Sequence, residues 1–227
     1  MQTNLTELLR IQETDNWELD YLSNGSPIFQ CKNLYTFSSD AVRLARAVEV
    51  ESGERIVDLC AGGGIVGLEI AEEVSCRGEG AVSIDFVEIQ EKVFALLEQN
   101  LKINKSSKNL RGFLTSVQEF SLCAENKQKY DKVVCNPPFF KIGAGKVSGD
   151  ETIAISRHEI KLTLDELFDA VSRVIKQGGM FYMIHITMRD NEIMKLAQKK
   201  GFELVSREDL SGKLARSIYQ FKFCSVR

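Results

Sequence analysis

The sequence predicts an α/β fold, with a doubly wound, mostly parallel sheet that carries helices on both faces. Short apolar runs alternate with segments of helical periodicity from residue 55 onward, which is the pattern of βαβ units. A glycine cluster at 62–64 joins the first apolar run to the first helical segment, as in doubly wound domains. The 227 residues suffice for one such domain with a short extension.

An antiparallel hairpin is expected ahead of this sheet. Two short runs within 17–30 flank the polar stretch 23–26, whose Asn-Gly pair suits a tight turn that needs positive φ. The polar residues at 38–40 then have the pattern of a helix start, which leads into an amphipathic helix over 41–45.

The alternating part of the chain predicts seven strands joined mainly by helices. Strands are expected at 56–59, 81–89, 112–115, 130–135, 180–186, 202–205 and 217–223. Helices are expected at 65–74, 90–103, 163–176 and 191–200. Gly178 and Gly179 are expected to end the helix at 163–176. The glycine-rich stretch 141–156 has the composition of a mobile loop beside a site.

The composition is that of a globular protein, with 44% apolar and 27% charged residues. No apolar run reaches the length of a membrane span, and the N-terminus lacks the layout of a secretory signal. The six cysteines include no Cys-x-x-Cys pair. Reduced thiols in a cytoplasmic protein are therefore expected, without a zinc site.

The net charge of −3 is unevenly distributed along the chain. Residues 49–98 hold twelve acids against three bases, whereas 195–227 hold eight bases against three acids. A basic C-terminal third would let one face of the protein contact a phosphate backbone. Solvated helix and strand faces explain the same pattern equally well from charge alone.

The loop at 58–64 has the features of a ligand-binding turn. Its glycines let a ligand approach the backbone, and the helix that follows offers unpaired N–H groups. Asp58 precedes the glycines, a position better suited to a cationic amino group than to a phosphate, and S-adenosylmethionine carries such an ammonium. Glu88 ends the second strand 24 residues beyond Gly64, near the spacing at which an acid accepts hydrogen bonds from ribose hydroxyls. Asp85 is the alternative for that role.

Two of the three prolines stand in the sequence Asn136-Pro137-Pro138-Phe139, directly after the apolar run 132–135. Proline stops a strand and holds the preceding residue extended. Asn136 is therefore expected at the carboxyl end of a parallel strand, where open α/β sheets bind ligands. An ordinary Asn-Pro turn after a strand is the alternative interpretation of these residues taken alone.

At these residues the chain resembles the Rossmann-like S-adenosylmethionine-dependent methyltransferases. Within them it is most similar to the bacterial tRNA adenine-N6 methyltransferases that modify the purine 3′ of the anticodon in a valine tRNA. The resemblance covers 29–223 and rests on the segments 37–42, 58–64, 87–90, 136–139 and 156–159. It implies a methyltransferase domain over 37–227 and an N-terminal hairpin extension over 1–36.

The resemblance implies S-adenosylmethionine as the cofactor, S-adenosylhomocysteine as its product, and no metal. The cofactor-binding residues would be Asp58, Cys60, Gly62, Gly64, Glu88, Ile89, Ser116, Val117 and Asn136. Cys60 stands where a first glycine is usual and would slightly reshape the loop. Relatives often carry an aspartate at the position of Ser116 to hold the adenine amino group. Here the Ser116 hydroxyl or the Val117 backbone would make that contact.

The implied catalytic residues are Asn136, Pro137 and Phe139. The exocyclic amine of adenine is a poor nucleophile because its lone pair is delocalised into the ring. The Asn136 side-chain oxygen and the Pro137 carbonyl would accept hydrogen bonds from its two N–H groups and favour a more tetrahedral nitrogen, while Phe139 stacks on the base. Positioning and fixed dipoles then replace a strong general base.

The implied partner is tRNA, and no membrane contact is expected. The sequence favours a monomer but leaves the oligomeric state open. The expected substrate-binding residues are Phe37, Asp40, Phe140, Lys141, Arg157 and His158. Phe37 and Phe140 would form walls of the pocket. The phosphates beside a splayed-out base would be held by Lys141, Lys146, Arg157, His158 and Lys161.

Other functions remain open from the sequence. A protein glutamine presents the same planar nitrogen, but enzymes that methylate it usually carry a long helical N-terminal domain, whereas only 36 residues precede Phe37 here. Ribosomal RNA or DNA amino-methylation is a further alternative. A non-catalytic S-adenosylmethionine-binding scaffold and a nicotinamide dehydrogenase come from different functional classes.

Overall fold

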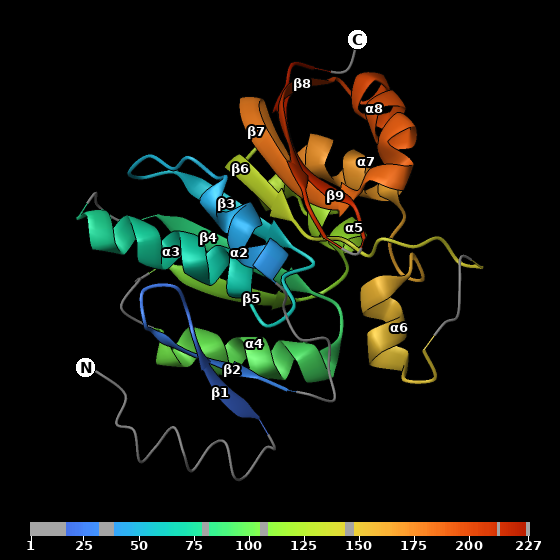
Figure 1. The fold of residues 1–227 in the computed structure, drawn as a ribbon. Coiled ribbons are helices and arrows are strands. Elements are labelled where there is room, and N and C mark those ends of the chain that lie inside the picture. Colours follow the sequence, from blue (N-terminus) through green and yellow to red (C-terminus); the bar gives the residue numbers. More distant parts are fainter. Residues whose placement is uncertain are drawn as a thin grey trace.

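A computed structural model describes residues 17–31, 39–78, 82–104, 109–143, 148–212 and 214–225. Its centre is a seven-stranded sheet with the order β5-β4-β3-β6-β7-β9-β8 (Figure 1). The strands are β3 (Arg55–Leu59), β4 (Ser83–Glu88), β5 (Leu110–Leu114), β6 (Tyr130–Cys135), β7 (Ile175–Ile186), β8 (Phe202–Leu210) and β9 (Arg216–Phe223). The pairs from β5 to β7 are parallel, and β9 is antiparallel to both β7 and β8. The predicted mostly parallel α/β fold is thereby confirmed.

Helices cover both faces of this sheet. They are α2 (Ser39–Arg46), α3 (Ile65–Arg77), α4 (Glu91–Ile103), α5 (Val117–Leu122), α6 (Glu151–Arg157), α7 (Leu164–Val174) and α8 (Asp190–Lys199). Helices α2 and α3 pack together on one face, and α5, α7 and α8 lie on the other (Figure 1). Successive side chains of a strand point to opposite faces of the sheet. Ile56 of β3 therefore packs in the hydrophobic core that includes α2 and α3, and its neighbour Val57 packs in the core that includes α5, α7 and α8.

The predicted hairpin is present as β1 (Glu18–Tyr21) paired antiparallel with β2 (Pro27–Gln30). It lies against α4 (Figure 1). The fully buried Asn100 of α4 exchanges two hydrogen bonds with the Phe29 backbone, at 2.7 and 3.0 Å, and also donates to the Gly63 carbonyl at 2.9 Å. One amide therefore fixes the hairpin and the glycine loop relative to each other. The division into an extension over 1–36 and a domain over 37–227 stays a prediction.

Two predicted segments were wrong in part. The helix expected over 163–176 ends at Val174, and Gly178 and Gly179 lie inside β7. Ile175 is fully buried and pairs with Tyr130 of β6, and Gly178 takes a φ of 78° where the register shifts. A Cβ on Gly179 would lie 2.8 Å from the Asp131 carbonyl oxygen. Strand pairing and close backbone approach, rather than a helix cap, explain these glycines.

The stretch 141–156 was expected to be a loop, but it contains most of helix α6. Asp150 caps this helix by accepting a hydrogen bond from the Ile153 N–H at 3.1 Å. Glycines before the cap obscured this helix start in the sequence. The short helix α5 was also not expected.

A membrane-spanning helix would need a longer apolar stretch than any helix in the described part of the chain provides.

Gly67, in the first turn of α3, lets the helix approach β4 closely. A Cβ at this position would lie 2.4 and 2.7 Å from ring carbons of the fully buried Phe86. We expect Gly67→Ala to lower the free energy of unfolding by about 2 kcal/mol, because overpacking outweighs the improved helix propensity. Chemical denaturation measures the change. Gly149→Ala, where a Cβ would meet nothing within 4 Å, is the matched control, and equal stability of the two variants would contradict the prediction.

Candidate functional site

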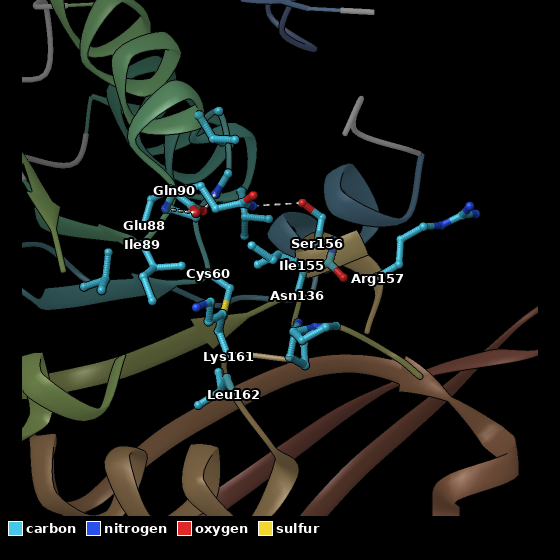
Figure 2. Close-up of a pocket in the computed structure, with 18 of the residues that line it drawn as sticks. Cys60, Glu88, Ile89, Gln90, Asn136, Ile155, Ser156, Arg157, Lys161 and Leu162 are labelled. Atoms are coloured by element: carbon cyan, nitrogen blue, oxygen red, sulfur yellow. Dashed lines mark hydrogen bonds between the residues drawn. The ribbon is translucent and has the colours of Figure 1, made fainter. Parts of the chain in front are cut away.

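A cavity of about 210 Å³ opens at the carboxyl ends of β3, β4 and β6. It is lined by many of the residues that the sequence singled out: Cys60, Gly62, Glu88, Ile89, Val117, Asn136, Pro137, Phe139, Phe140 and Arg157. Figure 2 shows Cys60 and Glu88 on one side of Asn136, and Ser156 and Arg157 on the other. The fold thus brings the glycine loop and the Asn-Pro-Pro-Phe segment to one site, as open α/β sheets do.

The glycine loop turns sharply between β3 and α3. Cys60, Gly62 and Gly64 all have left-handed backbones, with φ of 58°, 57° and 88°. A Cβ on Gly64 would also lie 2.6 Å from the Leu97 side chain, so this position requires glycine on two counts. Cys60 adopts the conformation that glycine adopts without strain.

Glu88 is fixed by two backbone donors at the end of β4. Its Oε2 accepts from the Gly62 N–H at 3.0 Å, and its Oε1 accepts from the Gln90 N–H at 2.9 Å. Only 6% of the residue is exposed, and burial raises the pKa of its carboxyl, opposed by these hydrogen bonds. Each oxygen of an ionised carboxylate has a second lone pair. Glu88 is therefore preorganised to accept hydroxyl hydrogen bonds from a ligand in the cavity.

Asp58 lies beneath the glycine loop and is not among the residues that line the cavity. Its Oδ2 accepts from the Gly67 N–H at 3.0 Å, which satisfies one of the free donors of the first turn of α3. Burial raises the pKa of Asp58 to about 7, and the neighbouring Glu88 carboxylate adds to the rise. The sequence placed this carboxylate toward a ligand ammonium, whereas its contacts in the structure are with the helix start.

The raised pKa of Asp58 predicts a pH-dependent stability. The folded protein holds this proton more tightly than the unfolded chain does, so the contribution of Asp58 to stability is fully present below its unfolded pKa and is lost as pH rises through about 7. One group of this kind gives a slope of at most about 1.4 kcal/mol per pH unit. We expect Asp58→Asn, which keeps an acceptor for the Gly67 N–H, to flatten this fall between pH 4 and 7. Melting temperatures of both proteins across that range test it, and parallel curves would contradict it.

Asn136 follows the last residue of β6, and the two prolines after it are buried. The Asn136 side chain faces the cavity. Within the described part of the chain it has no hydrogen-bond partner. The segment beyond it is held by two backbone bonds, from the Phe140 N–H to the Arg157 carbonyl at 3.0 Å and from the Glu159 N–H to the Phe140 carbonyl at 2.8 Å. A free carboxamide on a fixed turn is suited to orient a polar group of a substrate.

The structure places three of the expected substrate-binding residues, Phe140, Arg157 and Lys161, at the cavity wall. Arg157 is exposed and lines the cavity. Lys141 pairs with Glu192 at 2.9 Å, and Asp40 is buried in an ion pair with Arg216. His158 is 4% exposed and stacks obliquely on Phe140 at 5.7 Å. Phe37 and Lys146 lie outside the described residues.

The Ser116 side chain caps the start of helix α5. Its hydroxyl accepts from the Glu119 N–H at 3.1 Å, and the Ser116 backbone N–H donates to the Glu119 carboxylate at 3.4 Å, which makes a capping box for α5. Ser116 does not line the cavity, whereas its neighbours Thr115 and Val117 do. Of the two residues that the sequence offered for an adenine contact, Val117 is the one that lines the cavity.

Several cavity residues were missed by the sequence interpretation. Gln90 donates from its side chain to the Ser156 hydroxyl at 3.1 Å, which links the end of β4 to α6 across the cavity (Figure 2). The hairpin contributes its residues 28–30 to the wall, and Arg216 reaches the wall from β9. The hairpin residues and Arg216 are distant from the motifs in sequence and carry no motif of their own. Gln90 and Ser156 lie in the segments 87–90 and 156–159 that carry the resemblance, but only the folded chain reveals their contact.

The basic C-terminal third is less positive in the fold than in the sequence, because many of its bases have acidic partners. The ion pairs are Lys199 with Asp165 at 3.5 Å, Lys200 with Asp169 at 2.5 Å, Arg207 with Asp190 at 2.6 Å, and Arg216 with Asp40. The exposed pair of Lys199 with Asp165 contributes little to stability. Together the four pairs reduce the charge available for a phosphate backbone on this face.

Comparison with known proteins gives a consistent picture. Residues 37–188 match the family model of the methyltransferase small domain. A tRNA1(Val) (adenine(37)-N6)-methyltransferase from Dyadobacter fermentans is 28% identical over 169 residues, which are 74% of this chain and 66% of the relative. The enzyme of the same name from Erwinia tasmaniensis is 27% identical over 173 residues, 76% of this chain and 67% of the relative. The chain thus spans about two thirds of the length of these relatives.

Solved structures share the fold at low sequence identity. The M. jannaschii tRNA m1G37 methyltransferase superposes with a TM-score of 0.63 at 17% identity, covering 92% of this chain and 57% of that one. M. jannaschii TYW2 in complex with AdoMet gives a TM-score of 0.61 at 17% identity, covering 92% and 87%. These likenesses establish a common architecture.

Proposed function

The chain belongs to the methyltransferase small domain family, and on that premise we propose that it methylates the N6 amine of an adenine in tRNA, next to the anticodon of a valine tRNA, with S-adenosylmethionine as methyl donor. The observation that carries the proposal is the free Asn136 carboxamide, which faces the same cavity as the glycine loop and Glu88. The names of the relatives supply the tRNA and the nucleotide. A monomeric state and a cytoplasmic location are part of the same proposal.

The residues of the cavity fit S-adenosylmethionine. Glu88 offers two fixed carboxylate oxygens for the ribose hydroxyls. Ile89 and Val117 provide an apolar wall beside it for an adenine ring, and the left-handed turn at Gly62 keeps the backbone open to a close ligand. No group of three or more potential metal ligands occurs among the described residues, and the proposed reaction requires none.

The proposed mechanism depends on positioning. When bound, S-adenosylmethionine supplies an electrophilic methyl group on a sulfonium. The Asn136 side-chain oxygen and the Pro137 carbonyl would accept hydrogen bonds from the two N–H groups of the adenine amine and orient its lone pair for that methyl group. As the carbon–sulfur bond breaks and S-adenosylhomocysteine leaves, the amine would release one proton to water. Phe139 stacks on the base, and the buried Pro138 keeps the turn rigid. Fixed dipoles of this kind stabilise the developing charge without reorganisation.

One incubation with methyl-labelled S-adenosylmethionine tests the substrate. Separate pools of tRNA, ribosomal RNA, DNA and release factors are offered to the purified protein. Label is expected in tRNA, and digestion to nucleosides should recover it as N6-methyladenosine. Label confined to protein would support glutamine methylation instead, and label only in ribosomal RNA or DNA would reassign the nucleic acid. Cofactor binding without transfer to any pool would favour the non-catalytic scaffold.

A further inference from the structure

A buried arginine lies directly behind the Asn-Pro-Pro-Phe segment. The Arg189 side chain is 8% exposed, and its Nη1 donates to Glu159 Oε1 at 2.6 Å and to the Phe139 carbonyl oxygen at 3.3 Å. The other side of the guanidinium binds both oxygens of Glu192, at 2.9 and 3.2 Å. The single planar group thus holds two carboxylates and one main-chain oxygen of the segment.

The geometry points to Arg189 as a positioning residue that sets the placement of Phe139 and of the turn before it. This inference rests on the proposed function, since it assigns a cause to the position of the proposed catalytic groups. A buried guanidinium is costly unless its donors are satisfied. Ion pairing with Glu159 and Glu192 satisfies the charge, which leaves the bond to the Phe139 carbonyl as the contact that reaches the site.

Glu159 makes the arginine part of a wider support. Its Oε1 also accepts from the Leu164 N–H at 3.0 Å, at the start of α7, and its own N–H donates to the Phe140 carbonyl at 2.8 Å. The Phe139–Phe140 main chain is therefore attached on one side to the 157–159 segment and on the other to Arg189. Glu159 connects the first attachment to the start of α7, and Arg189 directly precedes α8. Packed helices therefore hold the turn in place on both sides.

The ring of Phe139 is supported from the same direction. It meets the His185 ring edge-on at 5.3 Å and 62°, and His185 is fully buried in β7. Burial and the neighbouring Arg189 charge lower the pKa of His185 to about 4, so the imidazole is neutral at pH 7. The aromatic ring thus packs against an uncharged surface, while Arg189 holds its main chain.

Arg189→Lys tests the inference. Lysine keeps the positive charge but cannot bind three acceptors in one plane, so the Phe139 contact should be lost first. We expect kcat for tRNA methylation to fall by about 10–100-fold, with the affinity for S-adenosylmethionine within about twofold of the wild type. We also expect amide hydrogen exchange of a peptide covering 136–141 to rise by about tenfold.

Arg111→Lys is the matched control. Arg111 makes a bidentate pair with the buried Asp85, at 2.9 Å for both bonds, and does not line the cavity. Its replacement should leave kcat and exchange at 136–141 unchanged. Glu159→Gln supplies a second variant, which keeps one acceptor oxygen but removes the charge that pairs with Arg189, and it should raise exchange at 136–141 by a smaller factor.

Exchange does not depend on the identity of the substrate, so the two proposals fail separately. If neither Arg189→Lys nor Glu159→Gln raises exchange at 136–141, the positioning role is overturned whatever the activity. A loss of melting temperature with unchanged kcat would likewise leave Arg189 a purely structural residue. If exchange rises as expected while the wild type methylates no tRNA, the positioning role stands and the proposed substrate is wrong.

Discussion

Asn136→Ala should slow methyl transfer to tRNA by about 10²–10³-fold, the usual effect of removing one fixed dipole from a reacting centre. The Asn136 amide faces the cavity without a protein partner among the described residues, so its removal breaks no hydrogen bond that holds the described fold. The loss should therefore appear in kcat. The affinity for S-adenosylmethionine should hardly change, because Glu88 and the glycine loop are left intact.

Single-turnover rates with labelled cofactor measure the effect, and titration calorimetry measures cofactor affinity. Asn191→Ala is the matched control, since Asn191 is exposed on α8 and lies outside the cavity. A wild-type rate in Asn136→Ala would remove the proposed mechanism. An equal loss in the control would indicate a general defect in folding.

Glu88→Ala should lower the affinity for S-adenosylmethionine by about 10²-fold or more. Two hydrogen bonds to a charged acceptor would be lost, and each contributes about 1.5–3 kcal/mol. The substitution also frees the N–H groups of Gly62 and Gln90, which now bond to the carboxylate at 3.0 and 2.9 Å. The glycine loop then loses one of its attachments to β4, which adds to the loss of binding, while the bond from the Ala61 N–H to the Val87 carbonyl at 3.0 Å remains.

Titration calorimetry of S-adenosylmethionine and of S-adenosylhomocysteine measures this effect. Glu91→Ala provides the control, because Glu91 is exposed at the start of α4 only three residues away. Unchanged affinity for both ligands in Glu88→Ala would show that the cofactor does not bind at this carboxylate, and would leave the cavity without its proposed ligand.

The sequence determined the strands, their order and the longer helices, because local patterns specify them, whereas α5 and α6 were not expected. Alternating apolar runs predicted the strands, and the glycine cluster and the proline pair marked the two turns that the structure brings to one cavity. The strength of these signals comes from backbone chemistry. A left-handed turn at Gly64 and a strand stop at Pro137 depend on residue type more than on distant contacts.

The sequence was less informative where neighbours compete for the same residues. The Gly178-Gly179 pair fits a helix end locally, but pairing of Ile175 with β6 makes it part of a strand. The sequence suggested that the Asp58 carboxylate contacts a ligand, whereas in the structure it accepts a hydrogen bond from the Gly67 N–H at the start of α3. In both cases the tertiary contact satisfied a backbone group that the sequence alone left without a partner.

What only the tertiary structure decided is the support of the site. The contact of Arg189 with the Phe139 carbonyl joins residues 50 positions apart, and Asn100 joins the hairpin to the glycine loop over 71 and 37 positions. No local pattern encodes such pairs, since they exist only once the sheet has set the distances between its carboxyl ends. Residue types specified the two turns, and packing of the whole chain fixed where they face each other.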